Sequence, residues 1–306
     1  MARGYEPDDF IGPRELSEEG ETEAPRLSRR GELSDQVRDD HTQGTGPVTN
    51  PDGARSPEPR KVYEIRGHRY RLRASEIETM VEVGKFRTIA LEDLNEFAYD
   101  GDKLRMRLDV ENLIRQGLVQ MKSVPEEEKG ARVLLTLSKA GHRFLTRNRF
   151  AGKDQALHFG FAHRREAHHD ADLYRLHQKA ADKIERRGGR NLRVILEYEL
   201  KKRICHDLAK LGPEGASAES KHTVAERHGL QVVCGKIPFP DERIEYDTPD
   251  GVRAQVDLEL ATSHYRGRLL AEKVRAGFSI YAHASDVSKL RRVLDQRELT
   301  AEILSL

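Results

Sequence analysis

Two runs of alternating apolar and polar residues stand out in the last quarter of the chain. In residues 243–248, Ile244 and Tyr246 share one face, and in residues 252–260 every second residue is apolar. This period of two is typical of half-buried strands. Pro249-Asp250-Gly251 lies between the runs and has the residue types of a tight turn. The pattern therefore predicts a β-hairpin.

The register of this hairpin follows from packing its apolar faces together, which pairs Thr248 with Val252. Asp241 then lies opposite Glu259 and diagonal to Asp257. Directly opposed Cβ atoms are about 5 Å apart, so three carboxylates would repel one another unless a cation lay between them. We expect a divalent-metal site here, and a solvated acidic strand face is the alternative.

A helix is predicted to follow the hairpin, because an apolar stripe at helical spacing runs from Leu269 to Tyr281. Lys273 lies at the edge of that stripe. A lysine directed toward the carboxylates would either pair with them or polarise a scissile phosphate and its attacking water. The sequence leaves both roles open.

Residues 61–150 have the pattern of a winged helix-turn-helix. Ser75 and Glu78 form a capping box at the start of a first helix. Further helices are predicted at 91–99 and 103–116. Strands at 118–122 and 132–137 then flank a charged loop, residues 125–130, as the wing.

In a winged helix-turn-helix the third helix enters the major groove of double-stranded DNA. Arginine suits guanine edges or phosphates, and asparagine pairs with adenine. The alternative is a winged helix that contacts only proteins, and the acidic loop at Glu126, Glu127 and Glu128 disfavours phosphate binding at the wing tip. We expect the outward, DNA-contacting side chains to be Lys103, Arg105, Arg107, Asn112 and Arg115.

The segment between these two regions leaves several alternatives open. Residues 143–165 are basic and form either a helix lying along DNA or a solvated linker. His169-Asp170, at the start of a helix predicted over 168–187, resembles the metal dyad of HD-type hydrolases, although a helix cap is favoured. Residues 192–200 are predicted as a strand, from which Glu197 or Glu199 would add a carboxylate or simply face solvent. A helix at 287–294 and a strand at 299–304 are the last elements predicted along the chain.

Asp241, followed by Asp257-Leu258-Glu259 on a hairpin, resembles the core motif of PD-(D/E)xK nucleases. The resemblance implies that Asp241, Asp257 and Glu259 hold Mg²⁺ or Mn²⁺, and that a lysine assists the attack of water. Glu259 occupies the usual position of that lysine. Lys273 on the following helix would therefore be a migrated replacement, as in some branches of that superfamily.

Residues 257–262, DLELAT, followed by Lys273 and Tyr281, are more narrowly similar to the replication-relaxation family. This similarity covers residues 73–283, including the stretches NLIRQGLV and LLTLSKAGHRFL. It implies a winged helix joined to a PD-(D/E)xK-like domain, in a protein of plasmids and other mobile elements.

Composition adds a division of charge along the chain. Residues 1–60 carry 14 acidic and 8 basic residues, while the remainder carries 38 acidic and 45 basic ones. The first segment has almost no periodic apolar positions, so we predict a disordered acidic tail. The remainder is mildly basic, which is compatible with nucleic acid. No apolar run of membrane-spanning length and no signal peptide is present, so the expected location is cytoplasmic, without a membrane partner.

Together these features predict an α+β protein with an acidic tail (1–60), a winged helix (61–150) and a PD-(D/E)xK-like domain (151–306). The expected function is a DNA-binding protein of a mobile element with a metal-dependent endonuclease domain. Double-stranded DNA is the expected partner, with replication or mobilisation proteins as further ones. The alternatives are a catalytically inactive accessory factor and a transcriptional regulator.

Overall fold

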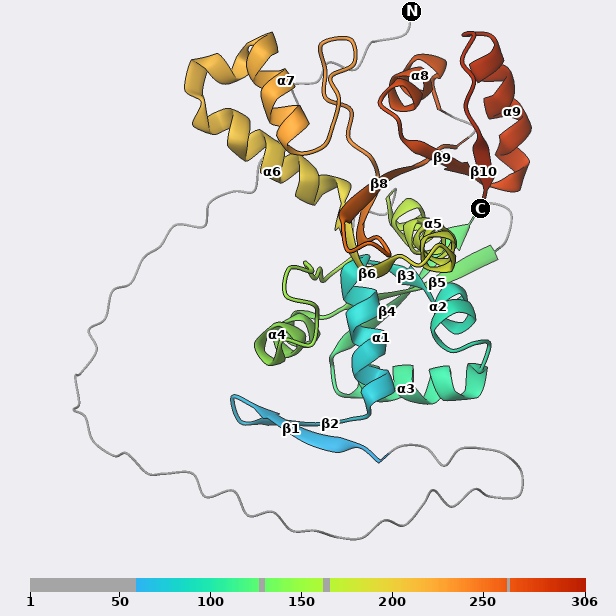
Figure 1. The fold of residues 1–306 in the computed structure, drawn as a ribbon. Helices are drawn as coiled ribbons and strands as arrows, with labels where there is room; N and C mark the ends of the chain where they lie inside the picture. The colour runs from blue at the N-terminus through green and yellow to red at the C-terminus, as the bar shows by residue number, and fades with distance from the viewer. Residues whose placement is uncertain (1–58, 127–129, 162–165, 263–264) are drawn as a thin grey trace, which may run out of the picture. The chain divides into compact units, whose positions relative to one another are not determined.

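The computed structural model describes residues 59–126, 130–161, 166–262 and 265–306, which fold into a mixture of helices and strands (Figure 1). The α+β class is therefore confirmed. The predicted acidic tail, up to residue 58, and the wing-tip residues 127–129 lie outside the described residues. Among the helices that the structure describes, none combines the length and apolar character needed to cross a membrane.

The described chain begins with a small antiparallel hairpin, β1 (Lys61–Ile65) and β2 (His68–Leu72), followed by three helices. These helices are α1 (Ala74–Lys85), α2 (Leu91–Ala98) and α3 (Lys103–Arg115). The capping box predicted at Ser75 is wrong. The N–H of Arg73 donates to the Glu76 carboxylate at 2.8 Å, so the helix is capped two residues earlier.

A three-stranded antiparallel sheet packs against these helices in the order β3–β5–β4. The strands are β3 (Ile89–Ala90), β4 (Val119–Glu126) and β5 (Gly130–Leu137), and α4 (Lys139–Asn148) follows. The sequence did not predict β3, because two residues are too few to show a period. The strands of the predicted wing are longer than expected and extend into the charged loop.

The second half of the described chain is built on a five-stranded sheet in the order β10–β9–β8–β7–β6. β6, β7 and β8 form an antiparallel meander, whereas β8, β9 and β10 run parallel. In chain order the elements are α5 (Ala167–Arg186), β6 (Arg190–Leu196), α6 (Glu197–Lys210), the 3₁₀ turn η1 (Gly212–Ala216), α7 (Ala218–Arg227), β7 (Glu242–Asp247), β8 (Arg253–Leu260), α8 (Gly267–Arg275), β9 (Ser279–Ala282), α9 (Ala284–Asp295) and β10 (Ile303–Ser305).

One predicted helix and one predicted strand are corrected by this arrangement. The helix expected along the stripe from Leu269 to Tyr281 ends at Arg275, and Tyr281 lies on β9. The strand expected over 192–200 ends at Leu196, and α6 begins at Glu197. The Glu199 carboxylate accepts the backbone N–H of Leu196 at 3.3 Å, which caps the new helix. The alternation continues past Leu196 because Tyr198 and Leu200 alternate with Glu197 and Glu199, although these residues are helical.

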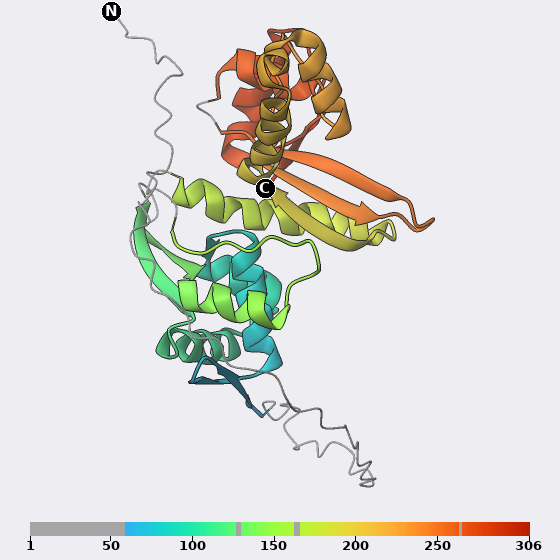
Figure 2. The same ribbon diagram turned by 90° about the vertical axis from the view of Figure 1, so that its left-hand side faces the viewer.

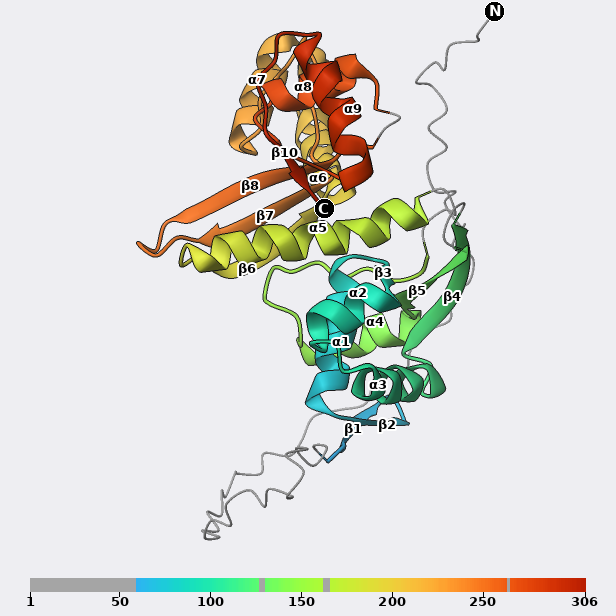
Figure 3. The same ribbon diagram turned by 90° about the vertical axis from the view of Figure 1, so that its right-hand side faces the viewer.

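Helix α5 lies between the five-stranded sheet and the first three helices (Figures 2 and 3). One apolar core runs across it, joining Phe86 after α1, Tyr174 of α5 and Ile244 of β7. Arg132 of β5 adds a buried polar contact, since its guanidinium reaches Asp93 at 2.8 Å and Asp172 at 2.7 Å. The domain division expected at residue 150 stays a prediction.

Candidate functional site

The register predicted for the β7–β8 hairpin is confirmed. The structure pairs Ile244 with Val256, and the Thr248 N–H donates to the Val252 carbonyl at 2.9 Å. Gly251 in the turn has φ +78°, a conformation that glycine adopts without strain. With Glu242 paired to Leu258, the preceding Asp241 lies across from Glu259. The apolar pattern alone therefore decided which acidic side chains meet.

Glu259 is completely buried and is bound by two donors. The Lys273 ammonium on α8 lies 2.8 Å from Oε1 and 2.9 Å from Oε2, and the Tyr265 hydroxyl also donates to Oε1. Burial and the charge of Asp241 raise the pKa of Glu259 to about 7, although Lys273 and Tyr265 oppose this rise. The expectation that Lys273 is directed toward the acids is confirmed.

Asp241 is held at the end of β7 by its backbone and side-chain contacts. Its Oδ2 accepts the Leu260 N–H at 2.8 Å, and its carbonyl accepts the Glu197 N–H at 3.0 Å. Its Oδ1 lies 3.5 Å from Nε2 of His169, at the start of α5. Burial opposes the charged imidazolium, but the hydrogen bond to Asp241 and the nearby carboxylates raise the His169 pKa to about 9. We call Asp241, Glu259 and Lys273 the acid–lysine cluster.

Asp257 does not join this cluster, although it lies on the same face of the sheet. Its two carboxylate oxygens accept from Arg243 at 2.6 and 2.9 Å, and Arg243 is itself only 3% exposed. The register that places Asp241 opposite Glu259 also places Arg243 opposite Asp257. The sequence therefore contained the information that predicts this ion pair. The prediction of three carboxylates around a cation did not take Arg243 into account.

Three further side chains near the cluster were missed or left open by the sequence. Tyr265 lies five residues beyond the end of β8, with no periodic signal of its own. His169 contacts Asp241 through the fold and does not cap its own helix. Glu197 starts α6 next to Asp241, and burial together with the charge of Asp241 raises its pKa. Among the described residues no group of three or more His, Cys, Asp or Glu is arranged to hold a metal ion.

The predicted DNA-contacting residues of α3 divide into two groups. Lys103, Arg105, Arg107 and Arg115 are exposed. Arg107 pairs with Glu111 at 2.7 Å on the helix surface, and the Arg105 guanidinium lies over the Tyr99 ring. The outward face also carries two exposed leucines, Leu104 and Leu108, which were not predicted to lie there.

The expected outward orientation of Asn112 is wrong. Asn112 is 8% exposed, and its side-chain amide donates to the Glu76 carboxylate at 2.9 Å and to the Arg71 carbonyl at 3.2 Å. A polar residue inside a helix needs such partners when it is buried. Here they come from α1 and from β2, which a helical pattern read on its own cannot show.

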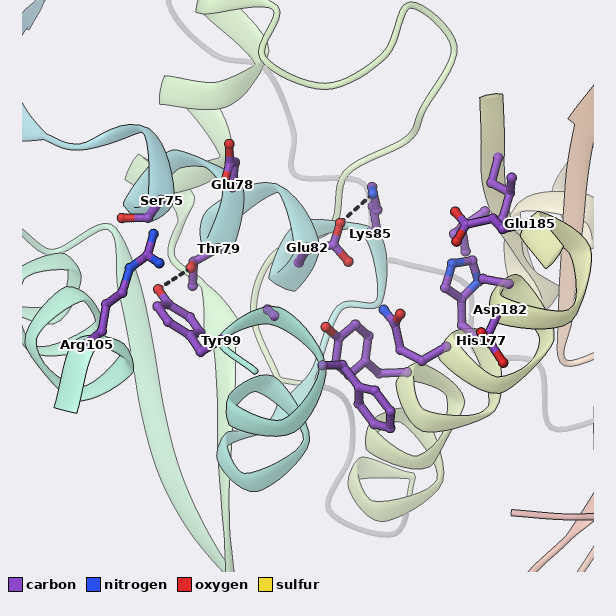
Figure 4. Close-up of a pocket in the computed structure, with 17 residues that line it drawn as sticks. Ser75, Glu78, Thr79, Glu82, Lys85, Tyr99, Arg105, His177, Asp182 and Glu185 are labelled. Atoms are coloured by element: carbon purple, nitrogen blue, oxygen red, sulfur yellow. Dashed lines mark hydrogen bonds and ion pairs between the residues drawn. The ribbon is translucent and has the colours of Figure 1, made fainter. Parts of the chain in front are cut away.

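A cavity of about 580 Å³ opens between α1 and α5, away from the acid–lysine cluster (Figure 4). Its lining includes four acidic residues, Glu78, Glu82, Asp182 and Glu185. The lining also includes Lys85, Arg105 and His177, of which Lys85 already pairs with Glu82 at 2.6 Å and His177 with Glu242 at 2.5 Å. This balance of charge does not suit a phosphate-bearing ligand.

Comparisons of the chain with protein-family models, with curated proteins and with solved structures gave no match.

Proposed function

We propose that this chain is a double-stranded-DNA-binding protein that joins a winged helix to an endonuclease-like unit acting on phosphodiesters. The resemblance to replication-relaxation proteins implies that it belongs to a mobile element. The observation that carries the proposal is the meeting of Asp241, Glu259 and Lys273 at the ends of β7, β8 and α8. An aspartate and a second acid at the ends of neighbouring strands, with a lysine beside them, are the groups that such nucleases use.

The order of elements in the second half supports the nuclease-like part. A helix, α5, precedes an antiparallel meander of β6, β7 and β8, and α8 then crosses over to β9, which runs parallel to β8. This is the αβββαβ order of the PD-(D/E)xK core. The segment of α6, η1 and α7 is an insertion between the first and second strands of that core.

The order of elements in the first half supports the winged helix. After α1, the short β3 precedes α2 and α3, and β4 and β5 then form a hairpin whose second strand pairs with β3. In such a fold α3 is the helix that enters the major groove. Its exposed cations, Lys103, Arg107 and Arg115, provide the positive charge that DNA binding needs.

The residues present fit a hard divalent cation, but with two protein carboxylates where the sequence predicted three. Asp257 is saturated by Arg243, so Asp241 and Glu259 would be the protein ligands. Mg²⁺ is commonly held by one or two carboxylates, with waters and substrate phosphates completing its shell. When bound, such an ion would stabilise negative charge on the phosphate and acidify a water.

The chain's own residues have separable roles around this site. Lys273 supplies positive charge at Glu259 and would stabilise the phosphate during attack. Tyr265 fixes the orientation of the Glu259 carboxylate through its hydroxyl. His169 places a proton beside Asp241 and would balance its charge while no cation is bound.

The test is nicking of supercoiled plasmid DNA in Mg²⁺ or Mn²⁺, with DNA binding measured on the same samples. We expect nicking by the wild type, its loss in Asp241→Asn and Glu259→Gln, and its retention in Asp257→Asn. Nicking that survives unchanged in Asp241→Asn would contradict the assigned site. Failure of the wild-type protein to bind duplex DNA would contradict the whole proposal.

A non-catalytic accessory factor or regulator is the second candidate. It is favoured by the saturation of the acids, because Arg243 neutralises Asp257, and both Glu259 oxygens accept from Lys273. DNA binding without nicking in either metal, by a protein whose Asp241→Asn variant binds equally well, would select this candidate.

A further inference from the structure

A second cavity, of about 380 Å³, lies between the tip of the β1–β2 hairpin and α4. Its lining holds three arginines, Arg66 at the hairpin tip and Arg143 and Arg147 on α4. We propose that this arginine pocket binds a phosphate of the DNA backbone, which gives the protein a second contact with DNA beyond α3. The inference rests on the proposed DNA binding and deepens it.

The charges of the pocket are not used within the described part of the protein. All three arginines are exposed, and none of them forms an ion pair with a described residue. The remaining lining residues are Ile65, His142 and Thr146, so no carboxylate is among the described residues that line the cavity. Arg143 and Arg147 are four residues apart and therefore project from the same side of α4. Guanidinium groups converging without an acid are suited to a phosphate.

Aromatic packing holds the two sides of the pocket together. On the inner face of the hairpin, the rings of Tyr63 and Tyr70 each lie 5.5 Å from that of Phe144 on α4, edge to face. Tyr63 also packs on Phe150 beyond the helix. This packing joins the hairpin to α4, so the backbone positions that carry the arginines are close together before any ligand arrives.

The turn at the hairpin tip gives an independent reason to look for a function at Arg66. Ile65 pairs with His68, so Arg66-Gly67 is a two-residue turn, and φ is +49° at Arg66 and +78° at Gly67. Asparagine is the residue preferred at the first of these positions, and a left-handed conformation is uncommon for arginine. Folding alone would be served better by Asn-Gly, so the arginine is explained by its charge.

The hairpin is also tied to α3, which makes the pocket part of one cationic surface. The Gln116 side chain at the end of α3 accepts the Arg71 N–H at 2.8 Å and donates to the Arg71 carbonyl at 3.0 Å. In Figures 1 and 2 the hairpin lies directly beside α3. Arg69 and Arg71 of β2 are exposed along this connection. Duplex DNA read by α3 would therefore present its backbone to the hairpin, which favours DNA over a free phosphate as the ligand.

The experiment compares duplex-DNA affinity and its salt dependence in the full chain. The test variant is Arg66→Asn/Arg143→Gln/Arg147→Gln, which keeps the turn type and the helix propensity. The matched control, Arg187→Gln/Lys289→Gln/Arg291→Gln, removes the same charge from exposed positions on α9 and at the end of α5. A third variant, Lys103→Gln/Arg107→Gln/Arg115→Gln, alters α3 only.

We expect the test variant to bind DNA roughly tenfold more weakly, with a slope of log K against log salt that is smaller by about 1 for one lost phosphate. The control should stay close to wild type. Arg66→Asn alone should leave the thermal midpoint unchanged or raise it, which separates binding from folding.

Three results would overturn the inference. Equal losses of DNA affinity in the test variant and the control would show that only the net charge of the protein matters. A loss confined to the α3 variant would preserve the proposed DNA binding and remove the pocket from it. Saturable binding of inorganic phosphate, lost in the test variant while its DNA affinity is unchanged, would assign the pocket to a free phosphate.

Discussion

The acid–lysine cluster and the arginine pocket use charge in opposite ways. At the cluster, Glu259 and Lys273 are buried and bound to each other, and Tyr265 and His169 add further hydrogen bonds or charge. At the pocket, three arginines stand in solvent without an acidic partner among the described residues. A buried charge is tolerated only when it is paired, whereas an exposed charge needs no partner.

The difference separates structural effects from binding effects. Removing one member of a buried pair changes the free energy of unfolding, because the other member stays in the interior. Removing an exposed cation changes affinity for an external anion and leaves the free energy of unfolding nearly unchanged. Variants in the two regions should therefore affect different measurements.

Lys273→Met should have the largest effect on stability. It leaves Glu259 buried without its cation, so we expect a loss of about 3 kcal/mol in the free energy of unfolding at neutral pH, measured by urea denaturation. Lys273→Met/Glu259→Leu should recover much of this loss, because neither charge then remains. A single variant as stable as wild type would show that the pair is not buried in solution.

Asn112→Ala should be less destabilising. It removes the amide donor to Glu76 and Arg71, and we expect a loss of about 1 to 2 kcal/mol in the free energy of unfolding. Arg115→Ala, one turn along the same helix but exposed, is the matched control and should change stability little while weakening DNA binding. Wild-type stability in Asn112→Ala, together with weaker DNA binding, would show that Asn112 faces outward and contacts DNA.

The His169 contact should appear as a dependence of stability on pH. The pKa of His169 is raised from 6.5 to about 9, so its stabilisation is fully present below pH 6.5 and is lost as pH rises through 9. Because the side chain is 37% exposed, we expect only about 1 kcal/mol after solvent screening. The gap in unfolding free energy between wild type and His169→Asn should close across this window. His206→Asn, at an exposed position on α6, should show no such closing, and a constant gap for His169→Asn would refute the contact.

Arg107→Gln should have the smallest effect on stability. Its pairing with Glu111 is an exposed contact four residues apart on the helix, so the thermal midpoint should not change measurably. Its affinity for duplex DNA should fall, and fall most at low salt, because a phosphate contact is screened by ions. A lower thermal midpoint with unchanged DNA affinity would show that Arg107 stabilises the fold and does not contact DNA.

The parts of the site that the sequence predicted share a physical basis. Alternation in residues 243–248 and 252–260 fixed the β7–β8 register, because a slip of one residue would turn every apolar side chain outward. The predicted helix also placed Lys273 toward the acids, but its stripe was extended too far, because α8 ends at Arg275 and Tyr281 lies on β9. The Arg243–Asp257 pair follows from the same register, which places the two residues opposite each other.

Other parts could not be predicted from local pattern. Asn112 fits an outward helical position, but β2 folds over it and supplies a carbonyl acceptor. Residues 197–200 continue an apolar–polar alternation, yet Glu199 caps a helix there. In both cases a hydrogen bond formed in the folded chain decides the structure, and the apolar–polar period predicts it incorrectly.

The sequence by itself determined the hairpin, its register and the opposition of Asp241 and Glu259, since these follow from which side chains must leave water. Only the tertiary structure brought His169 and Tyr265 to those acids and gathered Arg66, Arg143 and Arg147 around one cavity. His169 and Asp241 are separated by tens of positions along the chain, as are Arg66 and Arg143, and their proximity depends on how α5 and the β1–β2 hairpin pack. Tyr265 is only six positions from Glu259 but lies outside any helix or strand, so no period relates the two residues. Local periodicity carries no information about such packing.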